Sequence, residues 1–309
     1  MKPKITLIFI FSYAILGNAQ QYNEAERIEY SQYMYNSFTV NPGMTGMEGT
    51  PNFTINYRSE LLRDFNHYKR ESAMFSLPSK RKNMAFGFSI INDEYDDMQH
   101  TYFDLATAYD LKLNEKSNLS FGIKVRGNLL DHRFPESNSQ PLQDFYNSLV
   151  NRFVFNIGAG AVYSDDWFFV GLSVPSFLNT VHYDISELQV DTRQLPILFN
   201  TGYVFLLSND ISFMPMFYTR IQNEESTDID ISTNFLFQDK FGLNVVYRWD
   251  DHYGVFANFQ ILDAVMISLG YGNQTSLRTE GLAANDGIFQ ITLRYENILK
   301  RGGKLFTRF

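Results

Sequence analysis

The feature that most constrains this fold is an alternation of apolar residues with polar or small ones, which recurs along most of the chain. From Phe103 to Leu113, for example, every second residue is apolar or threonine, and Asp104 and Asp110 lie between them. Successive strand residues point to opposite faces, so each such segment has one apolar face and one polar or small face. We count about fourteen such segments, near residues 53–58, 71–77, 84–91, 101–113, 118–129, 152–163, 166–174, 195–207, 211–221, 227–237, 240–249, 252–262, 264–272 and 287–296.

The connections between these segments are unequal in length. Connections after even-numbered strands are short and turn-like, whereas those after odd-numbered strands include all the long ones. We expect the long ones at Ser59–Arg70, Asn92–His100, Leu130–Asn151, Pro175–Gln194 and Asn273–Asp286. A meander with tight turns on one side and long loops on the other is typical of outer-membrane barrels, whose longer loops face outward. We therefore predict an all-β fold, a transmembrane antiparallel β-barrel of about fourteen strands over residues 51–296. The alternative is a large soluble sandwich or propeller, whose strands also alternate.

The N-terminus and the composition agree with this location. Residues 1–19 are typical of a signal peptide, with Lys2 and Lys4 ahead of an apolar run and small residues before Gln20. That run is shorter than the roughly 20 residues that a spanning helix needs. The chain is 16% aromatic, yet its mean hydropathy is −0.24, which suits a barrel in which only every second residue meets lipid. We expect it in the outer membrane of a Gram-negative bacterium.

Charges fall on the polar face of several predicted strands. A barrel of this width is too wide to be filled by its own wall side chains, so we expect paired charges to line its lumen. The residues concerned are Asp104, Asp110, Lys112, Lys124, Arg126, Arg248 and Arg294. On the opposite face we expect lipid contact from Leu105, Tyr109, Phe121, Ile123, Leu243 and Val245.

The sequence gives little support for catalysis or for cofactor binding. No nucleophile, histidine and acid can be assembled from the spacing, so we predict that the chain is not an enzyme and binds no cofactor. Asp93, Glu94, Asp96 and Asp97 could offer oxygen ligands to calcium, but the loop lacks the glycine turn and distal carboxylate of a calcium-binding loop, which favours a solvated loop tip. A net charge of −8 argues against nucleic acid as a partner. The small residues Gly158–Gly160 are expected to let something pack closely against the wall.

Residues 20–50 precede the first strand and show no sustained alternation. Tyr33, Met34, Tyr35 and Phe38 are costly to leave in water and should be buried. We expect this segment to fold into the lumen as a plug, with Pro42 and Gly43 supplying a turn. The alternative is a periplasmic contact for another protein.

This N-terminal stretch also carries a family resemblance. Gln32-Tyr33-Met34-Tyr35-Asn36, followed by Asn41-Pro42-Gly43 and Gly46, resembles the start of the PorP/SprF family of the Bacteroidota, which opens with Gln-Tyr-Met-Phe-Asn and then Asn-Pro-Ala and Gly. Further similar elements are Phe86–Asp93, Leu119–Lys124, Phe169–Pro175 and Asn234–Phe241. Departures are Ser37 for Pro, Gly43 for Ala, and a basic tail, residues 297–309, beyond the last predicted strand. The motif residues of interest are Gln32, Tyr33, Met34, Asn36, Asn41, Pro42 and Gly46.

The resemblance implies a function that periodicity does not. It implies an outer-membrane barrel tied to type IX secretion, which assists the export or surface anchoring of a partner protein such as an adhesin of gliding motility. Its partners would be outer-membrane lipid and either secretion-machine subunits or a secreted surface protein. An outer-membrane channel for small or hydrophobic molecules is the alternative.

Overall fold

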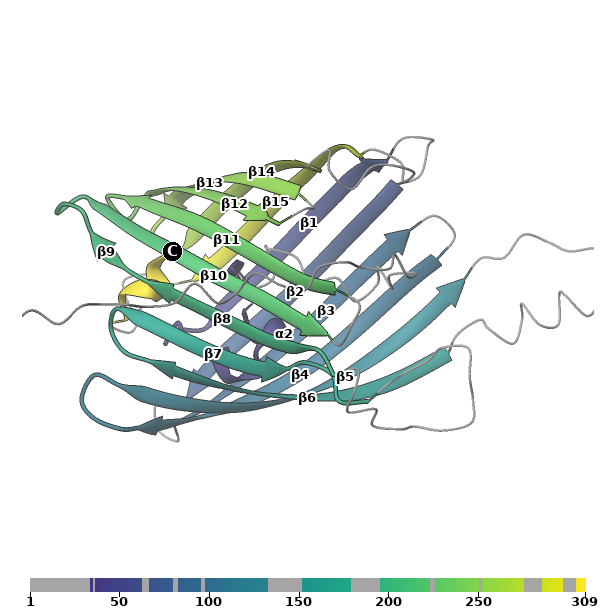
Figure 1. Cartoon of the computed structure of the whole chain (residues 1–309), viewed down its shortest axis with the longest axis horizontal. Helices are drawn as coiled ribbons and strands as arrows, with labels where there is room; N and C mark the ends of the chain where they lie inside the picture. Colours follow the sequence, from purple (N-terminus) through teal and green to yellow (C-terminus); the bar gives the residue numbers. More distant parts are fainter. Residues whose placement is uncertain are drawn as a thin grey trace, which may run out of the picture.

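The chain forms a closed antiparallel barrel (Figure 1). The computed structural model describes residues 34–35, 37–62, 67–79, 83–95, 98–132, 152–178, 195–222, 226–249, 252–274, 285–296 and 304–309. Its strands are β1 (Asn52–Leu62), β2 (His67–Ser79), β3 (Met84–Tyr95), β4 (Met98–Lys112), β5 (Asn118–His132), β6 (Arg152–Ser164), β7 (Phe168–Val174), β8 (Ile197–Tyr203), β9 (Phe205–Leu206), β10 (Ile211–Gln222), β11 (Ser226–Phe237), β12 (Phe241–Arg248), β13 (His252–Leu262), β14 (Val265–Gln274) and β15 (Asn285–Glu296).

Closure of the barrel comes from the pairing of β1 with β15, while every other strand pairs with its neighbours in sequence. β8 and β9 are two parts of one strand, because both pair with β10 in the same register and only Val204 separates them. The barrel therefore has fourteen strands. This confirms the fold class and the strand number expected from the alternation. Among the described residues, no helix is long and apolar enough to cross a membrane.

The two faces of the strands differ as the alternation predicts. Five of the six residues expected to meet lipid are exposed on the outer face and Leu243 is half-buried there. Aromatic rings on the outside of β6–β13 touch one another in sequence, with centroids 4.7 to 6.4 Å apart. The rings are those of Tyr163, Phe168, Tyr203, Phe205, Phe213, Phe235, Phe237, Phe241 and Phe259. Such a girdle is expected where a barrel meets the edge of a bilayer.

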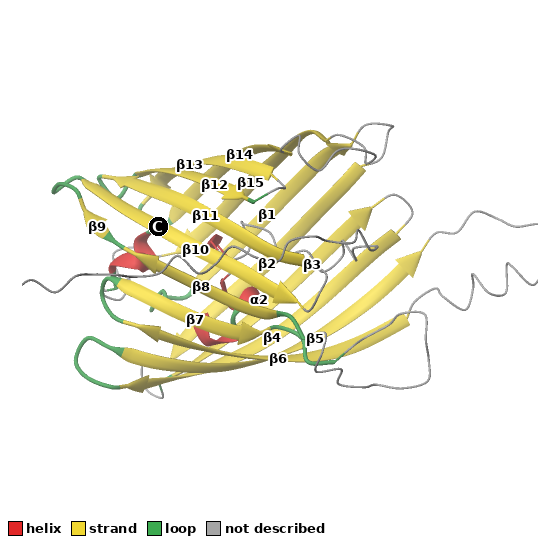
Figure 2. Cartoon of the chain, in the orientation of Figure 1, coloured by secondary structure: helices red, strands yellow, loops and turns green. Residues whose placement is uncertain are grey.

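Tight turns join the strands at one end of the barrel, which we call the turn end, and the opposite end is the loop end (Figure 2). Two expected loops were wrong. β1 continues to Leu62 and β2 begins at His67, so most of Ser59–Arg70 is strand; β3 continues to Tyr95 and β4 begins at Met98, so most of Asn92–His100 is strand as well. Polar residues fall on both faces in these stretches, which hides the alternation. The acidic cluster expected in the second loop is likewise revised, because Asp93 is a buried strand residue, whereas Asp96 and Asp97 lie outside the described residues.

Short helices occupy the interior near the turn end. They are α2 (Ser37–Val40) and the 3-10 helices η2 (Pro42–Met44) and η6 (Leu305–Arg308), and Figure 2 shows them between the strands in front and those behind. Residues from both ends of the chain share one apolar cluster with the inner wall, including Val40, Met44, Phe169, Phe306 and Phe309. The barrel is therefore packed near the turn end.

Candidate functional site: the N-terminal segment inside the barrel

The N-terminal segment, which we define as residues 34–50 without Asn36, is organised around Asn41 and Pro42. Asn41 is fully buried and extended, and its Oδ1 accepts the Gly43 N–H at 2.9 Å. Pro42 begins η2, where its missing N–H costs nothing, and the Thr45 hydroxyl donates to the Pro42 carbonyl at 2.7 Å. Asparagine before the helix and proline at its first turn thus fix a compact turn, as local capping chemistry requires.

Glycines of the inner wall make room for this turn. A Cβ at Gly122 of β5 would overlap the Pro42 carbonyl group, and one at Gly160 of β6 would overlap Asn41 Oδ1. A Cβ at Gly171 of β7 would lie 2.8 Å from Asn41 Nδ2. Three neighbouring strands therefore lack side chains where the turn is seated. Gly158–Gly160 had been expected to admit a closely packed group, and at Gly160 that group is Asn41.

Polar groups of the same wall hold the backbone of the segment. Lys124 Nζ donates to the Thr39 carbonyl at 2.5 Å, and Ser173 Oγ donates to the Val40 carbonyl at 3.0 Å. The amide of Asn41 also reaches the Ala161 carbonyl at 3.4 Å. The buried Lys124 ammonium thus binds the backbone of the N-terminal segment.

The segment reaches the opposite wall through Tyr35. Its hydroxyl donates to Asn258 Oδ1 at 2.7 Å, accepts from Asn244 Nδ2 at 3.4 Å and shares a 3.0 Å hydrogen bond with Ser268 Oγ. These partners lie on β13, β12 and β14. Burial raises the pKa of the Tyr35 hydroxyl, and the hydrogen bonds only partly oppose this effect. Anchors on β5–β7 and on β12–β14 mean that the segment spans the lumen.

Contacts with β2–β4 and β15 complete the seat. Phe38 is buried in a cluster with Met74, Ile91, Tyr102 and Ala106 of β2–β4. Gly46 has a φ of +71°, which favours glycine, and its N–H donates to Ser76 Oγ at 3.1 Å.

At the end of the segment, Thr50 Oγ1 donates to Glu296 Oε1 at 2.8 Å. Of the motif residues, Met34, Asn41, Pro42 and Gly46 lie inside the barrel; Gln32, Tyr33 and Asn36 lie outside the described residues.

The charges expected in the lumen occupy different environments. Asp104 is buried against Arg126 (Nε to Oδ1, 2.6 Å), and Arg248 is buried against Asp230 at the same distance. Arg294 Nη2 lies 2.7 Å from Glu296 Oε2.

Two of the expected lumen charges are less enclosed. Asp110 is half-buried and Lys112 is exposed, both near the turn-end terminus of β4.

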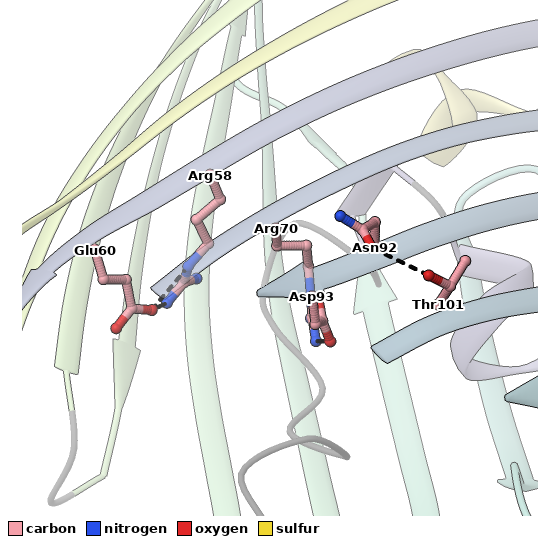
Figure 3. Close-up of polar contacts among 6 residues, drawn as sticks. All are labelled: Arg58, Glu60, Arg70, Asn92, Asp93 and Thr101. Carbon is pink, nitrogen blue, oxygen red and sulfur yellow. Dashed lines mark hydrogen bonds and ion pairs between the residues drawn. The ribbon is translucent and has the colours of Figure 1, made fainter. Parts of the chain in front are cut away.

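Further ion pairs near the loop end were missed by the sequence analysis. Arg58 contacts Glu60 along β1, and Arg70 of β2 lies 2.5 Å from Asp93 of β3 (Nε to Oδ1); Figure 3 shows both pairs, with Asn92 and Thr101 hydrogen-bonded nearby. They were missed because Glu60, Arg70 and Asp93 were expected to lie in loops. The available signal was charge complementarity at register partners: Arg70 lies opposite Asp93, as Arg248 does opposite Asp230.

The described part of the C-terminal tail, Lys304–Phe309, packs at the turn end. The Phe306 and Phe169 rings lie 5.2 Å apart, the Leu305 N–H donates to the Asp166 carbonyl at 2.7 Å, and Lys304 Nζ donates to Ser164 Oγ at 2.6 Å. Burial lowers the pKa of the Lys304 amine, and the carboxylates of Asp110, Asp166 and Asp165 partly offset this. The tail therefore closes over the same apolar cluster that holds the N-terminal segment.

Comparison with known proteins shows the family to which this chain belongs. The model of the type IX secretion system membrane protein family PorP/SprF matches residues 22–295. The chain belongs to the PorP/SprF family. The Asn-Pro turn of that family is thus, in this member, the turn seated on Gly122 and Gly160. Where the family often has alanine, a Cβ at Gly43 would lie 3.1 Å from Asn41 Oδ1 and 3.2 Å from the Ala161 Cα, so only a small shift would admit it.

Solved outer-membrane proteins share the fold. The toluene transporter TodX of Pseudomonas putida matches with a TM-score of 0.51 and 9% identity, covering 85% of this chain and 93% of that one. A TodX deltaS2 mutant, described as a monoaromatic hydrocarbon channel, gives 0.52 and 8% over 85% and 94%. Omp33 of Acinetobacter baumannii gives 0.48 and 10% over 82% and 100%. No curated protein matched the chain. The chain is thus an outer-membrane barrel of a secretion-linked family.

Proposed function

We propose that this protein is a plugged, non-conducting barrel that helps type IX secretion to export a partner protein or to anchor it at the cell surface. An adhesin of gliding motility is one candidate partner. The observation that carries the proposal is the N-terminal segment, which is buried in the lumen and anchored to opposite walls. A segment in this position obstructs the free passage of solutes through the lumen.

Under this proposal, the barrel has one closed half and one accessible half. By the general rule that periplasmic turns are short and external loops longer, the turn end faces the periplasm and the loop end faces outward. The N-terminal segment and the tail then fill the periplasmic half, whereas ion pairs such as Arg70–Asp93 line the outer half.

A channel for small or hydrophobic molecules is the competing function. Such a solute would have to pass the segment and then cross a half of the lumen lined by charged pairs, which disfavours a hydrophobic solute. The likeness to TodX bears on the fold and not on this choice.

Cell-surface proteomics of a strain that lacks the gene tests the proposal. Secreted proteins on the intact surface would be quantified with and without complementation by the full chain, beside uptake of a panel of small solutes. We expect one or more secreted proteins to fall several-fold at the surface while uptake stays constant. An unchanged surface proteome with reduced solute uptake would refute the proposal and favour the channel.

A further inference from the structure

The C-terminal tail lies between the N-terminal segment and the turn-end mouth of the barrel. Successive inner-face positions of β7 show this order. Phe169, which is nearest the turn end, packs against Phe306 of the tail, with ring centroids 5.2 Å apart. The next two inner-face positions serve the segment: Gly171 leaves room for the Asn41 amide, and Ser173 donates a hydrogen bond to the segment's backbone. On this wall the tail is therefore seated directly below the segment.

The N-terminal segment is joined to the barrel at the same end. Asn52, where β1 begins, is a turn-end residue, because it pairs with Ser76 close to the short β2–β3 connection. Thr50 is held beside it by Glu296, the last residue of β15. Because the segment enters the lumen at the turn end, it leaves by the same mouth unless the chain threads the whole barrel. The tail thus lies on the exit route of the segment.

Two turns of the turn-end rim hold the tail. In the β6–β7 turn, the Asp166 carbonyl accepts the Leu305 N–H at 2.7 Å. In the β11–β12 turn, Asp239 Oδ2 lies 3.5 Å from Arg308 Nη1. These turns are separated by β7, β8, β10 and β11, so the tail bridges the mouth over the wall formed by those strands.

The tail is coupled to the segment through apolar burial. Phe306 is 6% exposed and Phe309 is 8% exposed, and both belong to the cluster that contains Val40 and Met44 of the segment. No described residue of the tail pairs with a strand of the barrel. The tail can therefore detach without breaking the sheet, and its detachment uncovers the cluster in which the segment is packed.

We propose that the C-terminal tail is a latch, which blocks the exit of the N-terminal segment while it is docked and must detach before the segment can leave the lumen. The turn-end mouth then contains a binding site for a short peptide with two aromatic residues three positions apart, and the chain's own C-terminus occupies it. This inference rests on the proposed closure of the lumen by the N-terminal segment. It adds the order in which the two parts are released.

Single-channel recording of a barrel that lacks residues 304–309 tests the latch. We expect this truncated barrel to open about tenfold more often than the full chain, because burial of one phenylalanine side chain corresponds to a factor of that size. Phe306→Ser should have a similar effect, whereas Phe306→Leu keeps an apolar side chain against Phe169 and should stay close to the wild type. Far-ultraviolet circular dichroism would verify that each barrel is folded. A folded truncated barrel that opens no more often than the full chain would overturn the latch.

Addition of the missing peptide separates a latch from a general loss of stability. The probe is the peptide Lys-Leu-Phe-Thr-Arg-Phe, and the control peptide has serine in place of both phenylalanines. We expect the probe to close the truncated barrel from one side of the bilayer only, and the control to have no effect. Closure by both peptides would mean unspecific block, and closure by neither would mean that the mouth has no separable binding site. Either result would refute the inference.

The latch and the plug can fail separately. If a barrel without residues 24–46 conducts while the truncated barrel stays as closed as the full chain, the latch is wrong and the plug stands. If the full chain itself conducts freely, the closed lumen on which the latch rests is wrong.

Discussion

A methyl group placed at Gly122 should loosen the N-terminal segment without altering the outside of the barrel. In Gly122→Ala the new Cβ would overlap the Pro42 carbonyl group, which is backbone and cannot rotate aside. The segment must therefore shift as a unit. Overpacking of this kind costs about 1–3 kcal/mol, and each 1.4 kcal/mol is a factor of about ten, so the equilibrium for docking the segment should fall roughly 5- to 150-fold.

Single-channel recording in planar bilayers measures this effect directly. We expect Gly122→Ala to open more often than the wild type by a factor in that range. The matched control is Gly127→Ala on the same strand, whose Cβ points outward and meets only the flexible Phe153 ring. If Gly122→Ala opened no more often than this control, the seat that we describe for Pro42 would be wrong.

Three further predictions concern lipid, charge and pH. Leu105→Arg, on the outer face near mid-depth, should cost about 2–4 kcal/mol in denaturant unfolding from vesicles, whereas Asp131→Arg, beyond the lipid, should cost little; equal costs would contradict the inside and outside assignment. Arg248→Met should destabilise the barrel by about 3–5 kcal/mol because it leaves the buried Asp230 carboxylate without its partner. Adding Asp230→Asn should recover part of that loss, and a double variant as unstable as the single one would argue against the pair. The pKa of Lys304 is lowered in the docked tail, so at pH values between this lowered pKa and the ordinary lysine pKa the docked state binds fewer protons than the detached state. Docking of the tail should therefore strengthen as pH rises through that window. The mobility of a spin label at position 308 should fall over the same range, but not in Lys304→Met.

The wall of the barrel could be predicted from the sequence because period-two alternation is a local property. Lipid selects apolar residues on one face of each strand, as at Leu105 and Ile123, and the turn residues mark the strand ends. The prediction failed where this selection ends. Beyond the lipid, Lys69 and Arg70 are both polar although they face opposite sides, so this part of the strand was taken for a loop.

The interior was only partly predictable. Burial of Tyr35 and Phe38 followed from their apolar surface, and small residues at Gly158–Gly160 indicated a close neighbour. The side of the barrel that each residue of the segment contacts depends on pairs far apart in the chain, such as Lys124 with Thr39. The alternation within one strand carries no information about such pairs. The tail gave no signal of docking, because its burial depends on Phe169 and on the N-terminal segment together.

The conductance of a barrel that lacks residues 24–46 but keeps the signal peptide is the most direct test of the central proposal that the segment closes the lumen. The deletion removes the Asn41–Pro42 turn and the Tyr35 and Phe38 anchors and leaves every strand intact. We predict a folded barrel with a large, stable conductance that the full chain lacks. A folded deletion barrel whose conductance equals that of the full chain would contradict the plug and would point to a docking role for the segment.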